Sequence, residues 1–234
     1  MGSNQHIYLM PGLGANSLIF EYLKFPKRYS IHLLDWIMPI KNESLKDYCI
    51  RFSKQIKHEN VILIGVSFGG VIVQEIYKIK SAKKIIIISS IKNNKELPKS
   101  FRIIRTTKLH KIFPMSTFNN FFKFLKYSKI DKIYKRVNLA DRYLTVRDVG
   151  YLRWSINCLL NWDQQDSIEN IIHIHGDSDH IFPIKYINKS IVIDNGKHEM
   201  IITRAKWFNE NLIKIIEKYY FIIKCLMKSF NRTK

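Results

Sequence analysis

Cysteine is scarce in this sequence, and its three occurrences lie far apart. Cys49, Cys158 and Cys225 are odd in number and form no Cys-x-x-Cys pair. This pattern argues against a disulfide framework and against a structural zinc site built on cysteines. We therefore expect a reducing compartment, the cytoplasm, as the location of the protein.

Long apolar runs are also missing. No stretch reaches the roughly 18 apolar residues that a membrane-spanning helix requires. The first residues, MGSNQHIYLMPGLG, contain no basic segment followed by an apolar one, so we expect no signal peptide. The 234 residues are 46% hydrophobic and 25% charged, which is ordinary for a globular protein. The length fits one α/β domain that carries a modest insertion.

Acidic residues are few relative to basic ones. The chain has 39 Lys and Arg against 19 Asp and Glu, a formal net charge of +20. Such a charge suits attraction to nucleic acid, an anionic membrane surface or an acidic substrate. The lysines are scattered, however, without an RNA-reading motif or zinc-finger spacing, so we expect no specific nucleic-acid partner. A nucleic-acid or membrane-surface module stays as an alternative, for which binding that falls steeply with salt would be the evidence.

Short apolar runs alternate with stretches of helical periodicity, and this alternation indicates an α/β protein with a parallel sheet. We expect strands over 6–10, 29–34, 61–65, 85–89, 171–175 and 190–193, and helices over 44–57, 70–79, 148–162 and 205–220. The alternation stops between residues 92 and 162, where only helical periodicity is found. We therefore divide the chain into a core, 1–91 and 168–220, a helical cap insertion, 92–167, and a basic, apolar C-terminal tail, 221–234.

The predicted cap is basic and aromatic. Residues 92–147 hold 15 Lys and Arg but only three acidic residues. They also hold six phenylalanines: Phe101, Phe113, Phe118, Phe121, Phe122 and Phe124. Such a cap suits an apolar or an anionic acyl substrate. The alternative, which we favour for most of these residues, is that the phenylalanines form the cap's own core and the lysines a solvated face.

The strongest chemical signal is the G-x-S-x-G pattern Gly65-Val66-Ser67-Phe68-Gly69. It comes directly after a predicted strand and directly before a predicted helix. A serine on so tight a turn must adopt strained dihedral angles, and neighbours without side chains make room for it. The turn raises the hydroxyl of Ser67 above the sheet, next to a helix N-terminus that favours developing negative charge. The pattern predicts a nucleophilic serine.

A serine hydroxyl needs a base, and the base needs an acceptor that fixes its tautomer. His198 follows the last predicted strand and is the candidate base. Asp179 lies in the loop HGDSDHIFP after the preceding strand, and its D-x-x-x-P spacing places it beyond the strand end. Asp177 in the same loop is the competing acceptor, and its alternative role is to form a turn.

Histidines surround this aspartate loop and raise the question of a metal. His173, His175 and His180 lie within eight residues. No second carboxylate cluster accompanies them, and we expect His173 and His175 to face opposite sides of their strand. We therefore expect no metal site there.

The loop after the first strand, Pro11-Gly12-Leu13-Gly14, is glycine-rich. It lacks the third glycine of a dinucleotide fingerprint and the Gly-Lys-Ser/Thr ending of a P-loop, so phosphate binding is not expected. Instead the N–H of Leu13 suits an oxyanion near Ser67, with the N–H of Phe68 as the second donor. Gly12 would allow the close approach.

These pieces occur in the order glycine loop, serine, aspartate, histidine, each at a strand end. In this order the chain resembles the alpha/beta-hydrolase superfamily. The matching segments are PGLGAN at 11–16, GVSFGG at 65–70, HGDSDHIFP at 175–183 and NGKH at 195–198. The resemblance covers nearly the whole core, and the region between resembles the family's variable helical cap in location only.

The resemblance implies a doubly wound, mostly parallel sheet of about six strands, without the first two of the family's usual eight, and an inserted helical cap. It further implies a triad of Ser67, His198 and Asp179, an oxyanion hole formed by Leu13 and Phe68, and neither cofactor nor metal. The chain departs from the family at Pro11, where many relatives carry histidine, and at Lys197, often a glycine, but neither departure removes a catalytic atom.

The expected reaction is the transfer of an acyl group from a small-molecule ester or related compound to water, through an acyl-enzyme on Ser67. A serine at this position argues against dehalogenase and epoxide-hydrolase chemistry, where the resemblance would require aspartate. Two further alternatives use the same scaffold. An acyltransferase would pass the acyl group to an acceptor other than water, and an inactive binding protein would keep its ligand affinity after Ser67→Ala.

Overall fold

The computed structural model describes residues 4–108 and 141–230. These residues form one sheet of six parallel strands in the order β2-β1-β3-β4-β5-β6. The strands are β1 Gln5–Met10, β2 Tyr29–Leu33, β3 Ile62–Val66, β4 Lys84–Ile88, β5 Ile172–Gly176 and β6 Ile191–Ile193. The predicted doubly wound sheet of six strands is confirmed, with strand ends that differ from the expected ones by at most one residue.

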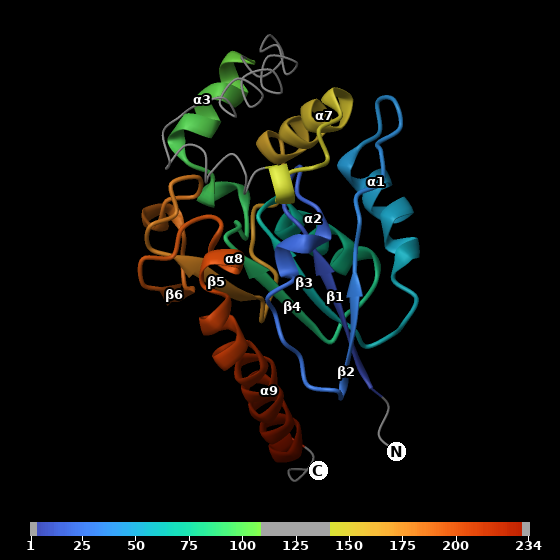
Figure 1. The fold of residues 1–234 in the computed structure, drawn as a ribbon, viewed down its shortest axis with the longest axis vertical. Helices are drawn as coiled ribbons and strands as arrows, with labels where there is room; N and C mark the ends of the chain where they lie inside the picture. Colours follow the sequence, from blue (N-terminus) through green and yellow to red (C-terminus); the bar gives the residue numbers. More distant parts are fainter. Residues whose placement is uncertain (1–3, 109–140, 231–234) are drawn as a thin grey trace.

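Helices cover both faces of this sheet (Figure 1). The α-helices are α1 Leu45–Phe52, α2 Phe68–Ile79, α3 Lys99–Thr107, α7 Val149–Leu160, α8 Met200–Thr203 and α9 Ala205–Phe230, and the 3-10 helices are η1 Ser17–Phe20, η2 Ser53–Gln55, η3 Asn94–Glu96 and η4 Ile184–Tyr186. Within the described residues, no helix combines the length and the apolar character needed to cross a bilayer.

The alternation of side chains along the strands divides the core into two layers. Tyr8 and Met10 of β1 pack on one face of the sheet with α1, α2 and α7. Ile7 and Leu9 pack on the other face with η1, α8 and α9. The central strands β3 and β4 are buried on both faces, which explains why they read as continuous apolar runs.

Two helices end well away from the predicted residues. The expected helix 44–57 is shorter, because the chain tightens into η2 and Ile56 then takes an extended conformation. Its predicted cap is present, since Ser44 Oγ accepts a hydrogen bond from the Asp47 N–H. The last helix runs to Phe230 rather than to residue 220, because no Gly or Pro occurs after Arg204 to stop it. Part of the predicted tail is therefore helical.

The described part of the predicted cap contains η3, α3 and α7, with no strand. Figure 1 shows α3 and α7 at the end of the molecule opposite both termini. Residues 109–140, which include the phenylalanines from Phe113 to Phe124, lie outside the described residues, as do residues 231–234 of the tail.

Candidate active site

Ser67 occupies the junction between β3 and α2 with an unusual backbone. Its φ is 53° and its ψ is −124°, a conformation that residues with side chains rarely adopt. Neighbouring groups hold it there. The Ser67 N–H donates to the Ile88 carbonyl over 2.9 Å, and the Ser67 carbonyl accepts from Gly70 N–H and from Ser90 Oγ at 2.8 and 2.7 Å. Such strain needs surrounding structure to maintain it and is typical of functional sites.

The glycines of the motif allow backbone segments to touch. A Cβ on Gly65 would collide with the carbonyl of Gly69, and a Cβ on Gly69 would collide with the carbonyls of Met10 and Pro11. The two outer glycines of G-x-S-x-G therefore pack the turn against its own helix and against the loop that follows β1. This packing brings that loop directly beside Ser67.

His198 and Asp179 reach Ser67 from the loops that follow β6 and β5. Ser67 Oγ lies 2.9 Å from His198 Nε2, and His198 Nδ1 lies 2.8 Å from Asp179 Oδ2. The two loops are joined where the Ser178 N–H donates to the Gly196 carbonyl over 3.0 Å. The structure thus brings all three predicted residues into one hydrogen-bonded line.

The competing carboxylate, Asp177, lies outside this line. It is exposed, and its Oδ1 accepts a hydrogen bond from Ser178 Oγ over 2.8 Å. Asp179 is buried, and its Oδ1 accepts from the N–H groups of Ile181 and Phe182 at 2.8 and 2.9 Å. These two bonds orient the carboxylate so that Oδ2 is left for His198.

The electrostatics of Asp179 follow from this arrangement. Burial acts to raise the pKa of its carboxyl, but the hydrogen bond and the charge of His198, together with the Phe182 N–H, outweigh burial. The pKa of Asp179 therefore lies below its ordinary value, and the ionised acceptor is the form that the site stabilises.

We expect Asp179→Asn to make the free energy of unfolding less dependent on pH at acidic pH. An aspartate in the unfolded chain has a pKa of about 3.9. Because the pKa of Asp179 is lower in the folded chain, its contribution to stability is fully present above that pH and is lost as the pH falls through the folded pKa. Urea melts between pH 2.5 and 6 would measure this, with the exposed Asp177→Asn as the matched control. If wild type and Asp179→Asn lose the same free energy of unfolding as the pH falls, the prediction is contradicted.

The expectation that His173 and His175 face opposite ways is wrong. Residues two apart on a strand share a face, because side chains alternate with a period of two. The two rings are in fact hydrogen-bonded, with His173 Nε2 3.1 Å from His175 Nδ1. His175 Nε2 donates to the Phe182 carbonyl over 2.7 Å, so its Nδ1 accepts from His173. Burial lowers the pKa of both rings, which favours neutral side chains that support the loop carrying Asp179.

The glycine loop after β1 lies against Ser67. A Cβ on Gly12 would come 3.3 Å from the Cβ of Ser67. Among the described residues, neither the Leu13 N–H nor the Phe68 N–H has a hydrogen-bond partner. Leu13 follows Gly12 and Phe68 follows Ser67, so both N–H groups belong to the two segments that meet at the serine.

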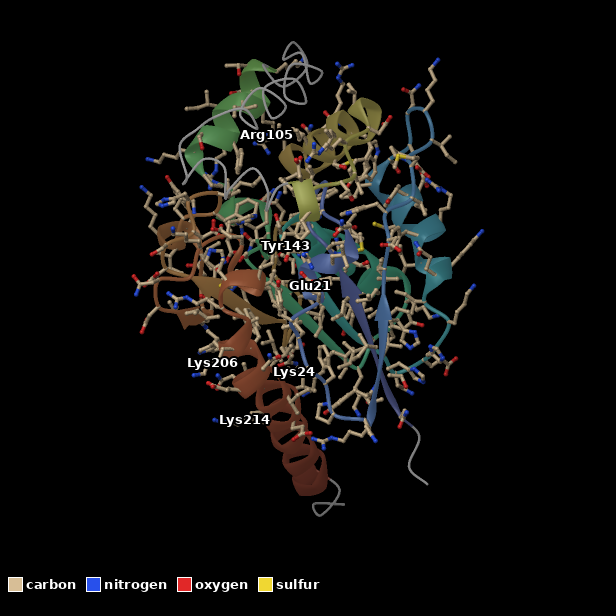
Figure 2. The ribbon with its side chains drawn as sticks, in the orientation of Figure 1. Glu21, Lys24, Arg105, Tyr143, Lys206 and Lys214 are labelled. Atoms are coloured by element: carbon tan, nitrogen blue, oxygen red, sulfur yellow. The ribbon has the colours of Figure 1, made fainter. Side chains whose placement is uncertain are left out.

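Residues 142–151 hold this loop from the other side. Asn16 N–H donates to the Tyr143 carbonyl over 2.8 Å, and the Val146 N–H donates to the Gly14 carbonyl over 3.0 Å. The Gly14 N–H donates to the Tyr151 hydroxyl over 3.3 Å. Figure 2 shows Tyr143 next to Glu21, to which its hydroxyl donates over 2.6 Å. Sequence reasoning missed these supports, because 122 to 137 residues separate the partners in the chain and no local pattern links them.

Comparison with solved structures agrees with this architecture. A lipase-esterase related protein from Clostridium acetobutylicum aligns with a TM-score of 0.61 at 19% identity, over 91% of this chain and 94% of the other. An esterase from Exiguobacterium antarcticum aligns with a TM-score of 0.60 at 19% identity, over 93% of each chain. A bromoperoxidase from Bacillus anthracis aligns with a TM-score of 0.60 at 16% identity, over 92% and 93%. This chain has the alpha/beta-hydrolase fold.

Sequence comparison contributes nothing further, since no protein-family model and no curated protein sequence matches the chain. The alpha/beta-hydrolase fold supports many reactions, so the fold alone does not assign one. The chemistry open to this chain depends instead on Ser67 and on the two side chains in line with it, His198 and Asp179.

Proposed function

We propose that this chain is a serine hydrolase that cleaves a carboxylic ester or a related acyl bond of a small molecule. The observation that carries the proposal is the line from Ser67 Oγ through His198 to the buried Asp179, with distances of 2.9 and 2.8 Å. The esterases among the similar structures support the same chemistry.

In the proposed reaction, His198 Nε2 takes the proton of Ser67 as the hydroxyl oxygen attacks the substrate carbonyl. Asp179 Oδ2 holds His198 in the tautomer with the proton on Nδ1 and stabilises the imidazolium that forms. The N–H groups of Leu13 and Phe68 donate to the oxyanion. His198 then protonates the leaving group, and water activated by the same base releases the acid from the acyl-enzyme.

Buried aromatic side chains pack against the site. The ring of Phe182 lies 5.6 Å from that of His198, edge to face. Phe68 stacks on Trp36 at 5.7 Å, and Trp36 Nε1 donates to the Gly12 carbonyl over 3.0 Å. These rings limit the water around Ser67 and fix the glycine loop, both of which strengthen hydrogen bonds to an oxyanion.

A fluorophosphonate probe tests the proposal, because it reacts with an activated serine. We expect wild type to be labelled once, and we expect Ser67→Ala and His198→Ala to remain unlabelled. Ser53→Ala, which removes a serine hydroxyl at the end of α1, should label like wild type. A folded wild type that stays unlabelled, also with the smallest probe, would refute the hydrolase proposal. Esters of increasing acyl length, assayed with and without alcohol acceptors, would then define the acyl group and separate hydrolysis from acyl transfer.

A further inference from the structure

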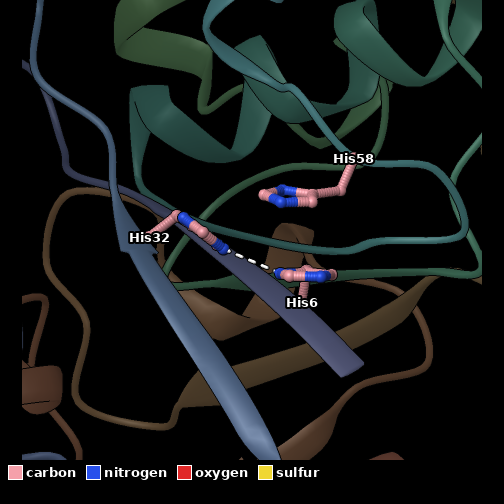
Figure 3. Close-up of side chains that lie close together, drawn as sticks. All are labelled: His6, His32 and His58. Atoms are coloured by element: carbon pink, nitrogen blue, oxygen red, sulfur yellow. Dashed lines mark hydrogen bonds between the residues drawn. The ribbon is translucent and has the colours of Figure 1, made fainter. Parts of the chain in front are cut away.

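Three histidines meet over β1 and the edge strand β2, on the edge side of the sheet. His6 lies near the start of β1, His32 near the end of the edge strand β2, and His58 in the segment between η2 and β3. One nitrogen of each ring lies within 4.8 Å of one nitrogen of each of the others. Figure 3 shows the three rings gathered over β1 and β2. No other group of this kind is found among the described residues.

The contacts between the rings are close. His6 Nδ1 lies 2.9 Å from His32 Nε2, and the rings of His6 and His58 stack with centroids 3.5 Å apart. All three side chains are partly exposed, so an ion can reach them from solvent. Three imidazoles packed together are costly as cations, since their charges repel, whereas neutral imidazoles are ligands for Zn²⁺, Cu²⁺ and Ni²⁺.

We propose that His6, His32 and His58 bind one divalent transition-metal ion of the Zn²⁺ type, each through one imidazole nitrogen. Nitrogens bound to one tetrahedral Zn²⁺ at 2.0–2.1 Å lie about 3.3 Å apart, so the ligand atoms must move by little more than about an ångström. Water would fill the fourth position. The donors are all nitrogen, which disfavours Ca²⁺ and Mg²⁺.

The Tyr8 hydroxyl orients the ring of His58. The Tyr8 hydroxyl lies 2.7 Å from His58 Nδ1 and accepts from the Lys57 N–H over 3.0 Å. With the proton of His58 on Nδ1, donated to the Tyr8 oxygen, its Nε2 carries the lone pair that a metal requires. Tyr8 is buried and stacks on His32 at 4.4 Å, so it supports two of the three rings.

Binding requires a change of ring orientation that the site permits. The planes of His6 and His58 differ by 10°, so the lone pairs of the two stacked rings do not converge. A rotation of His6 about its Cβ–Cγ bond would take its ring out of the stack and aim one nitrogen toward the nitrogens of His58 and His32, while His58 keeps its hydrogen bond to Tyr8. This torsion is broad in histidine, and the side chain of His6 is partly exposed.

The expected role of the ion is to stabilise the edge of the sheet. Its three ligands would link β1, the edge strand β2 and the segment before β3. The length of β3 separates His58 from Ser67, so the ion would take no direct part in chemistry at the serine. The proposal is therefore independent of the proposed hydrolase function.

Titration of the untagged protein with Co²⁺ and Zn²⁺ tests the site. Wild type should bind one equivalent of Co²⁺ with the visible absorption of nitrogen-ligated cobalt, and Zn²⁺ should displace it. We expect His32→Gln and His58→Gln to weaken binding at least tenfold, and Tyr8→Phe to weaken it about tenfold through the loss of ring orientation. His180→Gln removes an exposed imidazole outside the cluster and should bind as wild type does.

Thermal melting provides the second readout. Zn²⁺ should raise the melting temperature of wild type, because it binds the folded chain in preference to the unfolded one, and should leave that of His32→Gln unchanged. Melting in EDTA and circular dichroism show whether each variant folds. Equal affinity in wild type, His32→Gln and His58→Gln, or a wild type that neither binds Co²⁺ nor shifts its melting temperature with Zn²⁺, would overturn the proposal.

Discussion

Ser67→Ala, His198→Ala and the double variant are expected to lose ester hydrolysis to the same extent, about 10⁴-fold or more in kcat. The reason is the single hydrogen-bonded line that joins Ser67 Oγ to His198 Nε2. Without the base, the hydroxyl is a poor nucleophile at neutral pH, and without the hydroxyl, the base has no proton to take. Removal of the second member therefore costs nothing further.

Steady-state kinetics on one chromogenic ester would measure this, with active-site titration to correct for inactive protein. Ser178→Ala is a suitable control, because that hydroxyl donates only to the exposed Asp177. If the fold-loss of kcat in the double variant equals the product of the losses in the two single variants, the two side chains act independently. The proposed role of His198 as base for Ser67 would then be wrong.

Gly69→Ala is expected to destabilise the fold by about 3 kcal/mol and to lower kcat as well. A Cβ at this position would collide with the carbonyls of Met10 and Pro11. Both obstacles are backbone atoms at the end of β1, so relief requires that α2 or the glycine loop move. Either movement changes the distance between the N–H groups of Leu13 and Phe68, on which the proposed oxyanion site depends.

Urea denaturation and kcat on the folded fraction would measure the two effects. Gly150→Ala in α7 is the matched control, because its Cβ would meet only the side-chain oxygen of Asp148, at 3.2 Å. In that helix the exchange should change the free energy of unfolding by no more than about 1 kcal/mol, because the higher helix propensity of alanine offsets the small shift that the Asp148 side chain must make. A Gly69→Ala variant as stable and as active as wild type would show that the loop after β1 does not need its close contact with α2.

Local sequence patterns were sufficient for the strands, for most of the helices and for the strained turn at Ser67. Continuous apolar runs such as IIII in β4 predict buried parallel strands, because both faces of such a strand must meet apolar neighbours. The pattern around Ser67 predicts the strained turn, because Gly65 and Gly69 lie where side chains would collide with backbone. Helix ends were less well predicted where no Gly or Pro marks them, as in α9.

The sequence by itself determined which elements form and in what order, because hydrophobic periodicity and glycine positions are local properties of the chain. Only the tertiary structure decided what meets across the sheet. It brings Asp179 rather than Asp177 to His198, and residues 142–151 to the glycine loop. It also gathers His6, His32 and His58, of which each lies 26 residues after the one before it in the chain. The pairing of parallel strands joins residues that no spacing rule connects, because the crossovers between such strands have no fixed length beyond a minimum of about a dozen residues.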